Sequence, residues 1–429
     1  MELLVLAGDA TAAVAAEAAG AAGLGVHRCA TTAEAQALLA ATPTRFAALV
    51  AALGRGDADS CWPLLEAAKA RAPQLFAVVY SHTAQSDPKV RLQCFGAGAR
   101  MVTSYPAALQ QALAEVASTR ASGGALRCGY CGLEGLSEGG LHRHLDLYHT
   151  YEPNVEAPCP LCGDRSAAQR GGLAVHFHNS HGPPERREHP IGRCSLAAFA
   201  LVVCQRPSDG KFLLVQEPLG IGGGYWLPAG RVDPGETLVQ GGVREALEEA
   251  GVGVAIKSVL RFTLTDALRV IYLAHPVEGA DDTPKTVPDF ESAGSLWVSA
   301  DVVAERLSVA DCRSGRATEP LEWFPKVAAG ETGCALDTPG YRALEQAVLQ
   351  LGAERVDDPM AVLPRIGSSS SGRCRRMCSK GGSGRNICST KILSRTVIEF
   401  ARGLSGLNEL ACINPHTPPS TPGRLRNNS

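Results

Sequence analysis

The chain has few aromatic residues, no long apolar segment and almost no net charge. Only 5% of its 429 residues are Phe, Trp or Tyr, so its cores must be built mainly from Ala, Val and Leu. No stretch reaches the roughly 18 to 20 apolar residues that cross a bilayer, and the N-terminus lacks the basic flank of a signal peptide. We therefore expect an intracellular protein, cytoplasmic or nuclear, with no membrane partner.

The formal net charge of −2 hides an uneven distribution. Residues 366–429 hold ten Lys and Arg against two acidic residues, which leaves the rest of the chain acidic by about ten charges. This tail is rich in Ser, Gly and Arg, a composition typical of disorder, and its abrupt change of character leaves open whether it is a genuine part of the protein. The 15 cysteines are an odd number, and eight of them lie in CxxC pairs or in the tail. This pattern favours a reducing compartment with metal-bound and free thiols.

Residues 1–120 alternate short apolar runs with Ala-rich amphipathic stretches. We expect strands at 3–7, 46–51, 75–80 and 100–103, and helices at 10–19, 32–41, 63–71 and 107–116. Such alternation predicts a parallel sheet wrapped by helices. The layout resembles a flavodoxin-like, response-regulator receiver domain, although an unrelated small α/β domain is an equal alternative.

The chemistry of a receiver is missing from this block. Its acidic pair is reduced to Gly8-Asp9, the phosphoacceptor position lies in Ala51-Ala52-Leu53-Gly54, and Tyr105 precedes Pro106 where a Lys is needed. Only Ser81 matches. We expect a degenerate pseudo-receiver that is not phosphorylated and at most binds a partner.

The most informative stretch is 230–252, GRVDPGETLVQGGVREALEEAGV. Thr237 and Gln240 form a capping box and Gly251 is placed to end the helix, so a helix of about three and a half turns is expected over 238–250. Glu245, Glu248 and Glu249 fall on one face within an arc of about 100°. Three carboxylates so close repel one another, and a hard divalent cation such as Mg²⁺ resolves the conflict. A solvated acidic helix face is the bland alternative.

The whole string resembles the Nudix box, G-x5-E-x7-R-E-U-x-E-E-x-G-U, with small Ala246 at the first U position. The resemblance implies a mixed-sheet α/β/α sandwich over 191–352 and a pyrophosphohydrolase that uses Mg²⁺ or Mn²⁺. It implies the metal ligands Glu245, Glu248, Glu249 and the carbonyl of Gly230, with Glu236 and Arg244 as structural partners. The metal would activate water and neutralise charge on the leaving phosphate.

The flanks of the box fit the same fold. We expect hairpins over 198–204 with 211–216 and over 259–265 with 269–274, a strand at 295–298 and a helix at 341–351. The runs around Tyr225-Trp226-Leu227-Pro228-Ala229-Gly230 and around Glu291 are similar to Nudix enzymes that hydrolyse oxidised guanine nucleoside diphosphates. Trp226 is a candidate for stacking on a base, and Glu291 for a loop acid that assists. The alternatives are that Trp226 is an aromatic residue of the core and that Glu291 is a solvated loop acid.

Residues 125–183 carry two sets of zinc-ligand spacings. Cys128 and Cys131 are followed by His144 and His149, and a second set follows the same plan: Cys159, Cys162, His176 and His181. Both sets have the C2H2 spacing of zinc fingers, with His178 as an alternative to His176. Unrelated CxxC turns and histidines are the alternative.

The predicted fingers carry little that would read DNA. The base-contacting positions would be Ser137, Gly140, Arg143, Gln169, Gly172 and Val175, of which only one is basic. Sequence-specific DNA binding is therefore not expected, whereas protein docking, RNA contact or a purely structural role is. After a linker at 182–190 comes the catalytic block, whose substrate is expected to be a nucleotide. The rival functions are a nucleotide-sensing or RNA-associated zinc-finger adaptor and an RNA cap hydrolase whose basic tail holds RNA.

Overall fold

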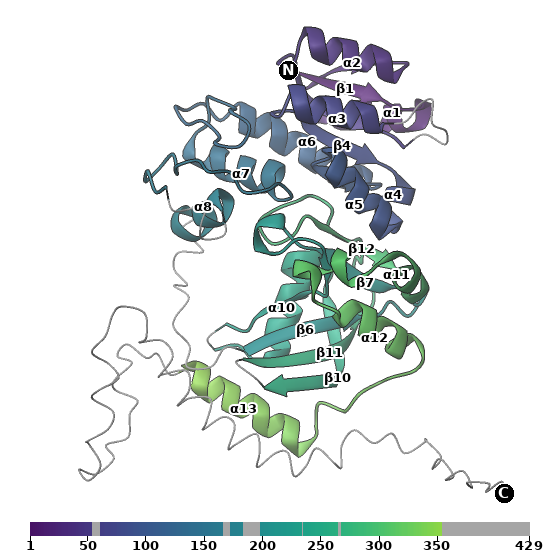
Figure 1. Ribbon diagram of the computed structural model, residues 1–429. Helices are drawn as coiled ribbons and strands as arrows, with labels where there is room; N and C mark the ends of the chain where they lie inside the picture. The colour runs from purple at the N-terminus through teal and green to yellow at the C-terminus, as the bar shows by residue number, and fades with distance from the viewer. Residues whose placement is uncertain (54–60, 166–171, 183–197, 234, 265–266, 354–429) are drawn as a thin grey trace, which may run out of the picture.

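The computed structural model describes residues 1–53, 61–165, 172–182, 198–233, 235–264 and 267–353. Along the chain lie an N-terminal α/β domain, a segment with two short helices, and a larger α/β block (Figure 1). The predicted tail 366–429, all but the first residue of the linker 182–190, and Gln169 lie outside the described residues. Within the described part, no helix combines the length and apolar character needed to cross a membrane.

The N-terminal domain is built on five parallel strands in the order β2-β1-β3-β4-β5. This is the strand order of flavodoxin-like sheets. Helices α1 and α6 cover one face, and α2, α3 and α5 cover the other. The elements are β1 (Glu2–Leu6), α1 (Asp9–Ala21), β2 (Gly25–Arg28), α2 (Thr32–Ala41), β3 (Phe46–Ala51), α3 (Trp62–Arg71), β4 (Phe76–Tyr80), α4 (His82–Ser86), α5 (Pro88–Ala97), β5 (Met101–Thr103) and α6 (Pro106–Arg120).

Three elements of this domain were not among the predicted ones. Strand β2 has no buried residue, because it forms the edge of the sheet and its sequence GVHR has no apolar run. Helices α4 and α5 begin with side-chain caps from Ser81 and Asp87, and Pro88 occupies the first turn of α5. These are local start signals of helices, and the apolar spacing alone does not reveal them.

The second segment contains α7 (Glu138–His149) and α8 (Leu173–His181). Ser137 caps α7 by accepting a hydrogen bond from the backbone N–H of Gly140. Leu136, Leu141 and Leu145 form a small core with Leu173 and Phe177 of α8. The two helices therefore share one core and do not form separate units.

The C-terminal block contains a four-stranded sheet, β10-β11-β6-β9, and a three-stranded sheet, β12-β7-β8. Helices α10 and α13 cover one face of the larger sheet, and α12 packs on its other face together with the smaller sheet. The elements are β6 (Ala198–Cys204), β7 (Phe212–Gln216), η3 (Leu219–Ile221), β8 (Tyr225–Trp226), β9 (Ala229–Arg231), α10 (Leu238–Ala250), β10 (Val254–Leu264), β11 (Leu268–Pro276), β12 (Gly294–Val298), α11 (Ala300–Arg306), η4 (Val309–Asp311), η5 (Arg313–Gly315), α12 (Glu319–Ala328) and α13 (Pro339–Ala353).

One of the two predicted hairpins is wrong. Strands β6 and β7 meet only at the bridge between Gln205 and Phe212, after which they diverge into different sheets. Apart from Gln216 at the end of β7, both strands are apolar, so each is buried on two faces, and the turn sequence between them does not fix their pairing. The hairpin of β10 with β11 is confirmed.

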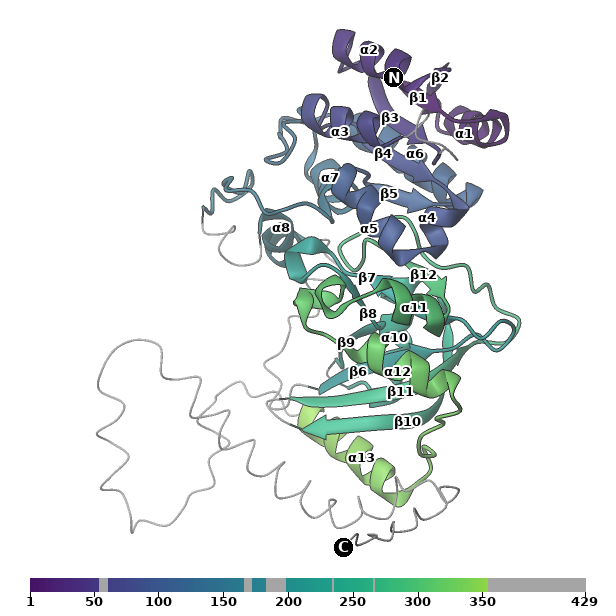
Figure 2. The same ribbon diagram turned by 45° about the vertical axis from the view of Figure 1, so that its right-hand side comes forward.

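The N-terminal domain docks directly on the smaller sheet of the C-terminal block. Helices α4 and α5 lie beside β7 and β12 in both ribbon views (Figure 2). The guanidinium of Arg91 is buried between them and donates to Gln216 Oε1 (2.7 Å), Gln85 Oε1 (2.8 Å) and the backbone oxygens of Val102 (2.9 Å) and Ala293 (3.0 Å). At Gly294 a Cβ would lie 2.4 Å from Arg91 Nη2, so only glycine leaves room for this guanidinium. The interface is therefore a polar core built around one arginine.

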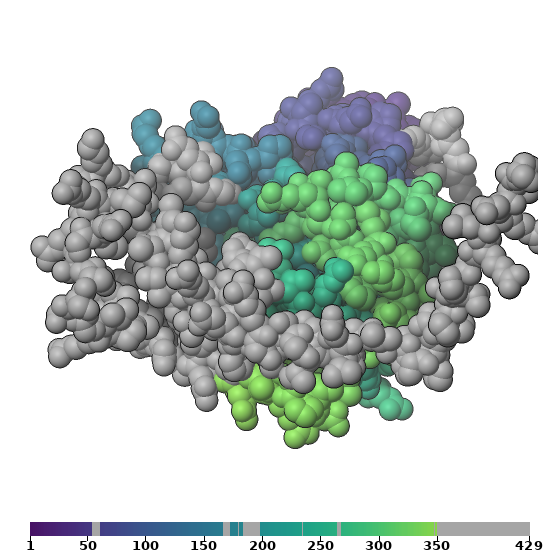
Figure 3. All heavy atoms as spheres, turned by 60° about the horizontal axis from the view of Figure 1, so that its bottom comes forward, coloured from purple at the N-terminus to yellow at the C-terminus, as the bar shows by residue number. Residues whose placement is uncertain are grey.

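The segment with α7 and α8 also contacts the C-terminal block. The hydroxyl of Thr150 donates to the Asp289 carbonyl (3.1 Å), and Leu219 N–H donates to the Thr150 carbonyl (2.9 Å). The ring of His178 stacks on Phe290 with centroids 3.4 Å apart. The contacts reach two loops of the C-terminal block, 217–224 and 286–293. In the space-filling view of Figure 3, α11 and α12 face the reader, and the N-terminal domain lies behind them.

Candidate active site and metal centres

Helix α10 carries the acidic residues of the predicted box. It begins at a full capping box between Thr237 and Gln240 and ends at Gly251, whose φ of 72° is the left-handed conformation that glycine adopts readily. The predicted bounds 238–250 are confirmed. The helix is amphipathic, and the face bearing Ala246 and Ala250 packs on β6, β7 and β11.

Two of the three predicted ligand carboxylates are buried. Glu245 and Glu249 point into the block, whereas the side chain of Glu248 is 40% exposed. Glu249 Oε2 accepts a hydrogen bond from the backbone N–H of Ala229 (2.9 Å). Burial raises the pKa of Glu245 to about 7, and burial together with the charges of Glu217 and Glu245 raises the pKa of Glu249. These groups therefore form an acidic cluster, in which a bound cation would favour the charged carboxylates.

Gly230 allows the backbone of β9 to approach this acidic cluster. An added Cβ at this position would lie 2.1 Å from the carboxyl carbon of Glu245. The glycine thus lets the Glu245 carboxylate rest against the backbone, which brings the carbonyl-bearing strand close to the acidic helix.

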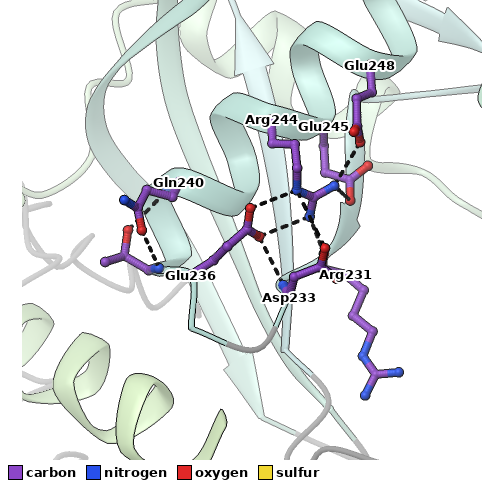
Figure 4. Close-up of polar contacts among 8 residues, drawn as sticks. Arg231, Asp233, Glu236, Gln240, Arg244, Glu245 and Glu248 are labelled. Carbon is purple, nitrogen blue, oxygen red and sulfur yellow. Dashed lines mark hydrogen bonds and ion pairs between the residues drawn. The ribbon is translucent and has the colours of Figure 1, made fainter. Parts of the chain in front are cut away.

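Arg244 joins the helix to the preceding loop (Figure 4). Its Nε donates to Glu236 Oε1 (2.8 Å), and its Nη1 contacts both Glu245 Oε1 and Glu248 Oε2 at 2.8 Å. Its Nη2 donates to the carbonyl of Arg231 (2.7 Å), while Glu236 accepts from Asp233 N–H (3.0 Å). The structure thus brings Glu236, Arg244, Glu245 and Glu248 together as one ion-pair network.

The loop 286–293 brings Glu291 toward the same pocket. Asp289 Oδ1 accepts the backbone N–H groups of Glu291 (3.0 Å) and Ser292 (3.1 Å), which fixes the turn, and the Ser292 hydroxyl donates to the Glu249 carbonyl (2.6 Å). The charge of Glu291 contributes to raising the pKa of Glu249. Its predicted role as an assisting acid remains a prediction.

Trp226 lies in the core of the block. Its indole N–H donates to Glu319 Oε2 (2.9 Å), and the guanidinium of Arg313 lies 4.4 Å from its ring centroid. The side chain is 9% exposed. Stacking of a base on this ring remains a prediction, and one face of the ring is already covered by Arg313.

Glu217 was not among the predicted site residues. It follows β7 directly, is fully buried, and neither carboxylate oxygen has a hydrogen-bond partner within the described part of the chain. Its nearest cation is Arg313, at 3.7 Å from Nη1 to Oε1. Burial raises its pKa to about 7. A glutamate directly after an apolar strand that ends in Gln216 was the signal available in the sequence.

The four predicted ligands of the first finger converge. Donor atoms of Cys128, Cys131, His144 and His149 all lie within 4.8 Å of one another. Cys131 Sγ is 3.2 Å from His144 Nε2, and Cys128 Sγ is 3.4 Å from His149 Nε2. His149 Nδ1 faces the Glu152 carboxylate at 2.5 Å, an outer contact that orients the ring. The set offers two sulfur and two nitrogen donors, which suits tetrahedral zinc.

The second predicted set converges in the same way: Cys159, Cys162, His176 and His181 have donor atoms within 4.8 Å of one another. Cys162 Sγ lies 3.3 Å from His176 Nε2. The alternative His178 is not in this group, because its ring stacks on Phe290. Of the two histidines, the structure therefore selects His176.

Comparisons with known proteins find similarity in the C-terminal block. Residues 196–314 match the family model of the NUDIX domain. The chain is 31% identical over 129 residues to the 8-oxo-dGDP phosphatase NUDT18 of Homo sapiens and 39% identical to that of Mus musculus, in each case covering 29% of this chain and 39% of the relative. It is 28% identical over 127 residues to Phosphatase NudJ of Escherichia coli strain K12, covering 29% of this chain and 80% of that protein.

The chain thus spans about two fifths of the length of the two NUDT18 relatives. Among solved structures, a NUDIX hydrolase from Nitrosomonas europaea is 24% identical, with 32% of this chain and 91% of that chain covered and a TM-score of 0.26. The family model and the curated relatives together support a NUDIX pyrophosphohydrolase domain in this block.

Proposed function

We propose that this protein, whose residues 196–314 match the NUDIX domain, is a divalent-cation-dependent hydrolase that cleaves a diphosphate linkage in a nucleoside diphosphate derivative. The observation that carries the proposal is a pair of buried carboxylates on a helix that begins and ends at the predicted residues: Glu245 lies against the Gly230 backbone, and Glu249 accepts the N–H of Ala229. Buried carboxylates are costly unless they are paired or bind a metal.

The donor set fits Mg²⁺ or Mn²⁺, because both ions prefer oxygen ligands. The carbonyl of Gly230 and the carboxylates of Glu245, Glu248 and Glu249 would hold the ion. When bound, the ion supplies a Lewis acid that lowers the pKa of water and neutralises charge on phosphate. Arg244 orients Glu245 and Glu248, and Glu236 holds Arg244 against the loop. Glu291 lies on a fixed turn from which it would assist proton transfer.

An oxidised guanine nucleotide is the first substrate to test, because two relatives at 31% and 39% identity are named 8-oxo-dGDP phosphatases. The test is product analysis with Mg²⁺ on a panel of oxidised and normal guanine di- and triphosphates, ADP-ribose, dinucleoside polyphosphates and capped RNA. Glu249→Gln is the loss-of-function variant, and Glu305→Gln, an exposed residue of α11, is its matched control. Turnover that is lost in the first variant and kept in the second supports the proposal. A folded protein that turns over no member of the panel contradicts it.

We further propose that each cysteine–histidine cluster binds one zinc ion and that the fingers have a structural role. Their helices share one core, and Thr150 and His178 contact loops of the NUDIX domain. We interpret the N-terminal domain as a pseudo-receiver. Its partner is the NUDIX domain of the same chain, which it contacts through Arg91.

A further inference from the structure

The acidic cluster is joined by a carboxylate that comes neither from the Nudix box nor from the loop of Glu291. Glu217 comes from the end of β7, not from α10, and its side chain is fully buried. Because Glu217 N–H donates to the Gly224 carbonyl (2.9 Å), its backbone is anchored, and the residue is not a frayed strand end. The residue is therefore held in the interior by the fold.

Neither oxygen of Glu217 receives a hydrogen bond from the described residues. Burying a carboxylate without donors is unfavourable, and a bound ion is one explanation for such a group. Arg313 is close enough for a weak ion pair, yet its guanidinium is 3.7 Å away and lies over the ring of Trp226. Arg313 therefore leaves the hydrogen-bonding capacity of Glu217 unused.

Glu217 lies next to the elements that carry the acids of the proposed cation centre, because β7 packs against α10 and is hydrogen-bonded to the loop of Glu291. Two hydrogen bonds connect this loop to both elements. Ala293 N–H donates to the Gln216 carbonyl (2.8 Å), and the Ser292 hydroxyl donates to the Glu249 carbonyl (2.6 Å). Glu217 thus lies beside the acidic cluster, at the end of the strand that packs against α10.

We propose that Glu217 is a further ligand of the divalent cation, supplied by β7 in addition to the residues of the helix. This inference rests on the proposed cation-dependent hydrolase. A ligand on β7 ties the cation centre to the strand that Arg91 fixes through Gln216, so the metal joins α10 to the sheet on which the N-terminal domain docks.

The test is binding of Mn²⁺ to the full chain. Binding is measured by titration calorimetry and by the electron paramagnetic resonance signal of free Mn²⁺. We expect Glu217→Gln to weaken Mn²⁺ binding by about tenfold or more, in the range that loss of a metal-supporting group produces. Arg313→Met removes the competing cation, so we expect it to leave Mn²⁺ binding unchanged or tighter. If Glu217 only paired with Arg313, both variants would leave Mn²⁺ binding at the wild-type value, which would overturn the proposal.

Two controls separate the possible failures. Glu249→Gln must weaken Mn²⁺ binding, and if it does not, the proposed cation centre fails as a whole. If Glu249→Gln weakens binding while Glu217→Gln does not, only the role of Glu217 is wrong. Thermal unfolding without metal guards against misfolding, because Glu217→Gln removes a buried carboxylate that receives no hydrogen bond and is expected not to lower the midpoint.

Discussion

Replacing Gly230 by alanine tests the geometry of the pocket with a single methyl group. The new Cβ would lie 2.1 Å from the Glu245 carboxyl carbon and 2.2 and 2.3 Å from its two oxygens. Carbon atoms in favourable contact are about 3.5 to 4.0 Å apart, so the carboxylate must retreat by roughly 1.5 Å. A misplacement of about 1 Å in an active site can cost a factor of about 100, which corresponds to roughly 2.7 kcal/mol of transition-state stabilisation.

The fold is expected to tolerate the change. Gly230 is not among the glycines with positive φ, so alanine adopts its backbone conformation without strain, and the obstructing atoms belong to the end of a side chain. We therefore expect kcat/KM to fall about 100-fold while the thermal midpoint shifts by no more than about 2 °C. The matched control is Gly340→Ala, where a Cβ meets nothing within 4 Å.

The assay is hydrolysis of the nucleotide that the wild-type protein turns over, at saturating Mg²⁺, alongside differential scanning fluorimetry. Full activity in Gly230→Ala with an unchanged midpoint would refute the reasoning, because the Glu245 carboxylate would then have no need of its observed position. A large loss of stability would also contradict it, since the clash would then have been absorbed by the backbone.

Three further variants follow from the same structure. Arg91→Met leaves four buried acceptors without their donor, so we expect the free energy of unfolding, measured by denaturant titration, to fall by about 3 kcal/mol or more. Arg91→Lys should cause a smaller loss. A loss below about 0.5 kcal/mol in Arg91→Met would disprove the role of this bridge. Metal analysis should find two zinc ions per chain, falling to one in Cys131→Ser and staying at two in Cys94→Ser, a buried thiol of the N-terminal core; unchanged zinc in Cys131→Ser would exclude that residue as a ligand. Arg244→Met should lower kcat/KM about 10- to 100-fold, because Glu245 and Glu248 lose their shared partner, and wild-type kinetics would show that the network is dispensable.

Local signals in the sequence predicted the centre of the site well. The capping box and the terminal glycine fix α10 through contacts between residues a few positions apart, which a sequence displays directly. The zinc-ligand spacings also predicted correctly which side chains converge, because a CxxC turn and a helical pair of histidines are local geometries.

Features that depend on distant partners were not predictable in the same way. The pairing of β6 and β7 was wrong, because two apolar strands joined by a turn can enter either one sheet or two. Glu217 escaped notice because its meaning lies in its buried neighbours and not in its spacing from the box. The docking of α5 on the smaller sheet involves Arg91, whose acceptors lie up to 202 residues away, and a hydrogen bond from Tyr225 to Pro88.

The interface around Arg91 has a consequence for the modularity of this chain. A protein cut before residue 191 would lose the donor for Gln216 and Ala293, and the hydroxyl of Tyr225, which donates to the Pro88 carbonyl (2.8 Å), would lose its acceptor. Excising the catalytic block therefore exposes a face that is now buried, and its polar groups would have to bond to water instead. Substitutions in α4 or α5 would likewise alter the surface that contacts the catalytic block, although these helices lie more than 100 residues before its first strand.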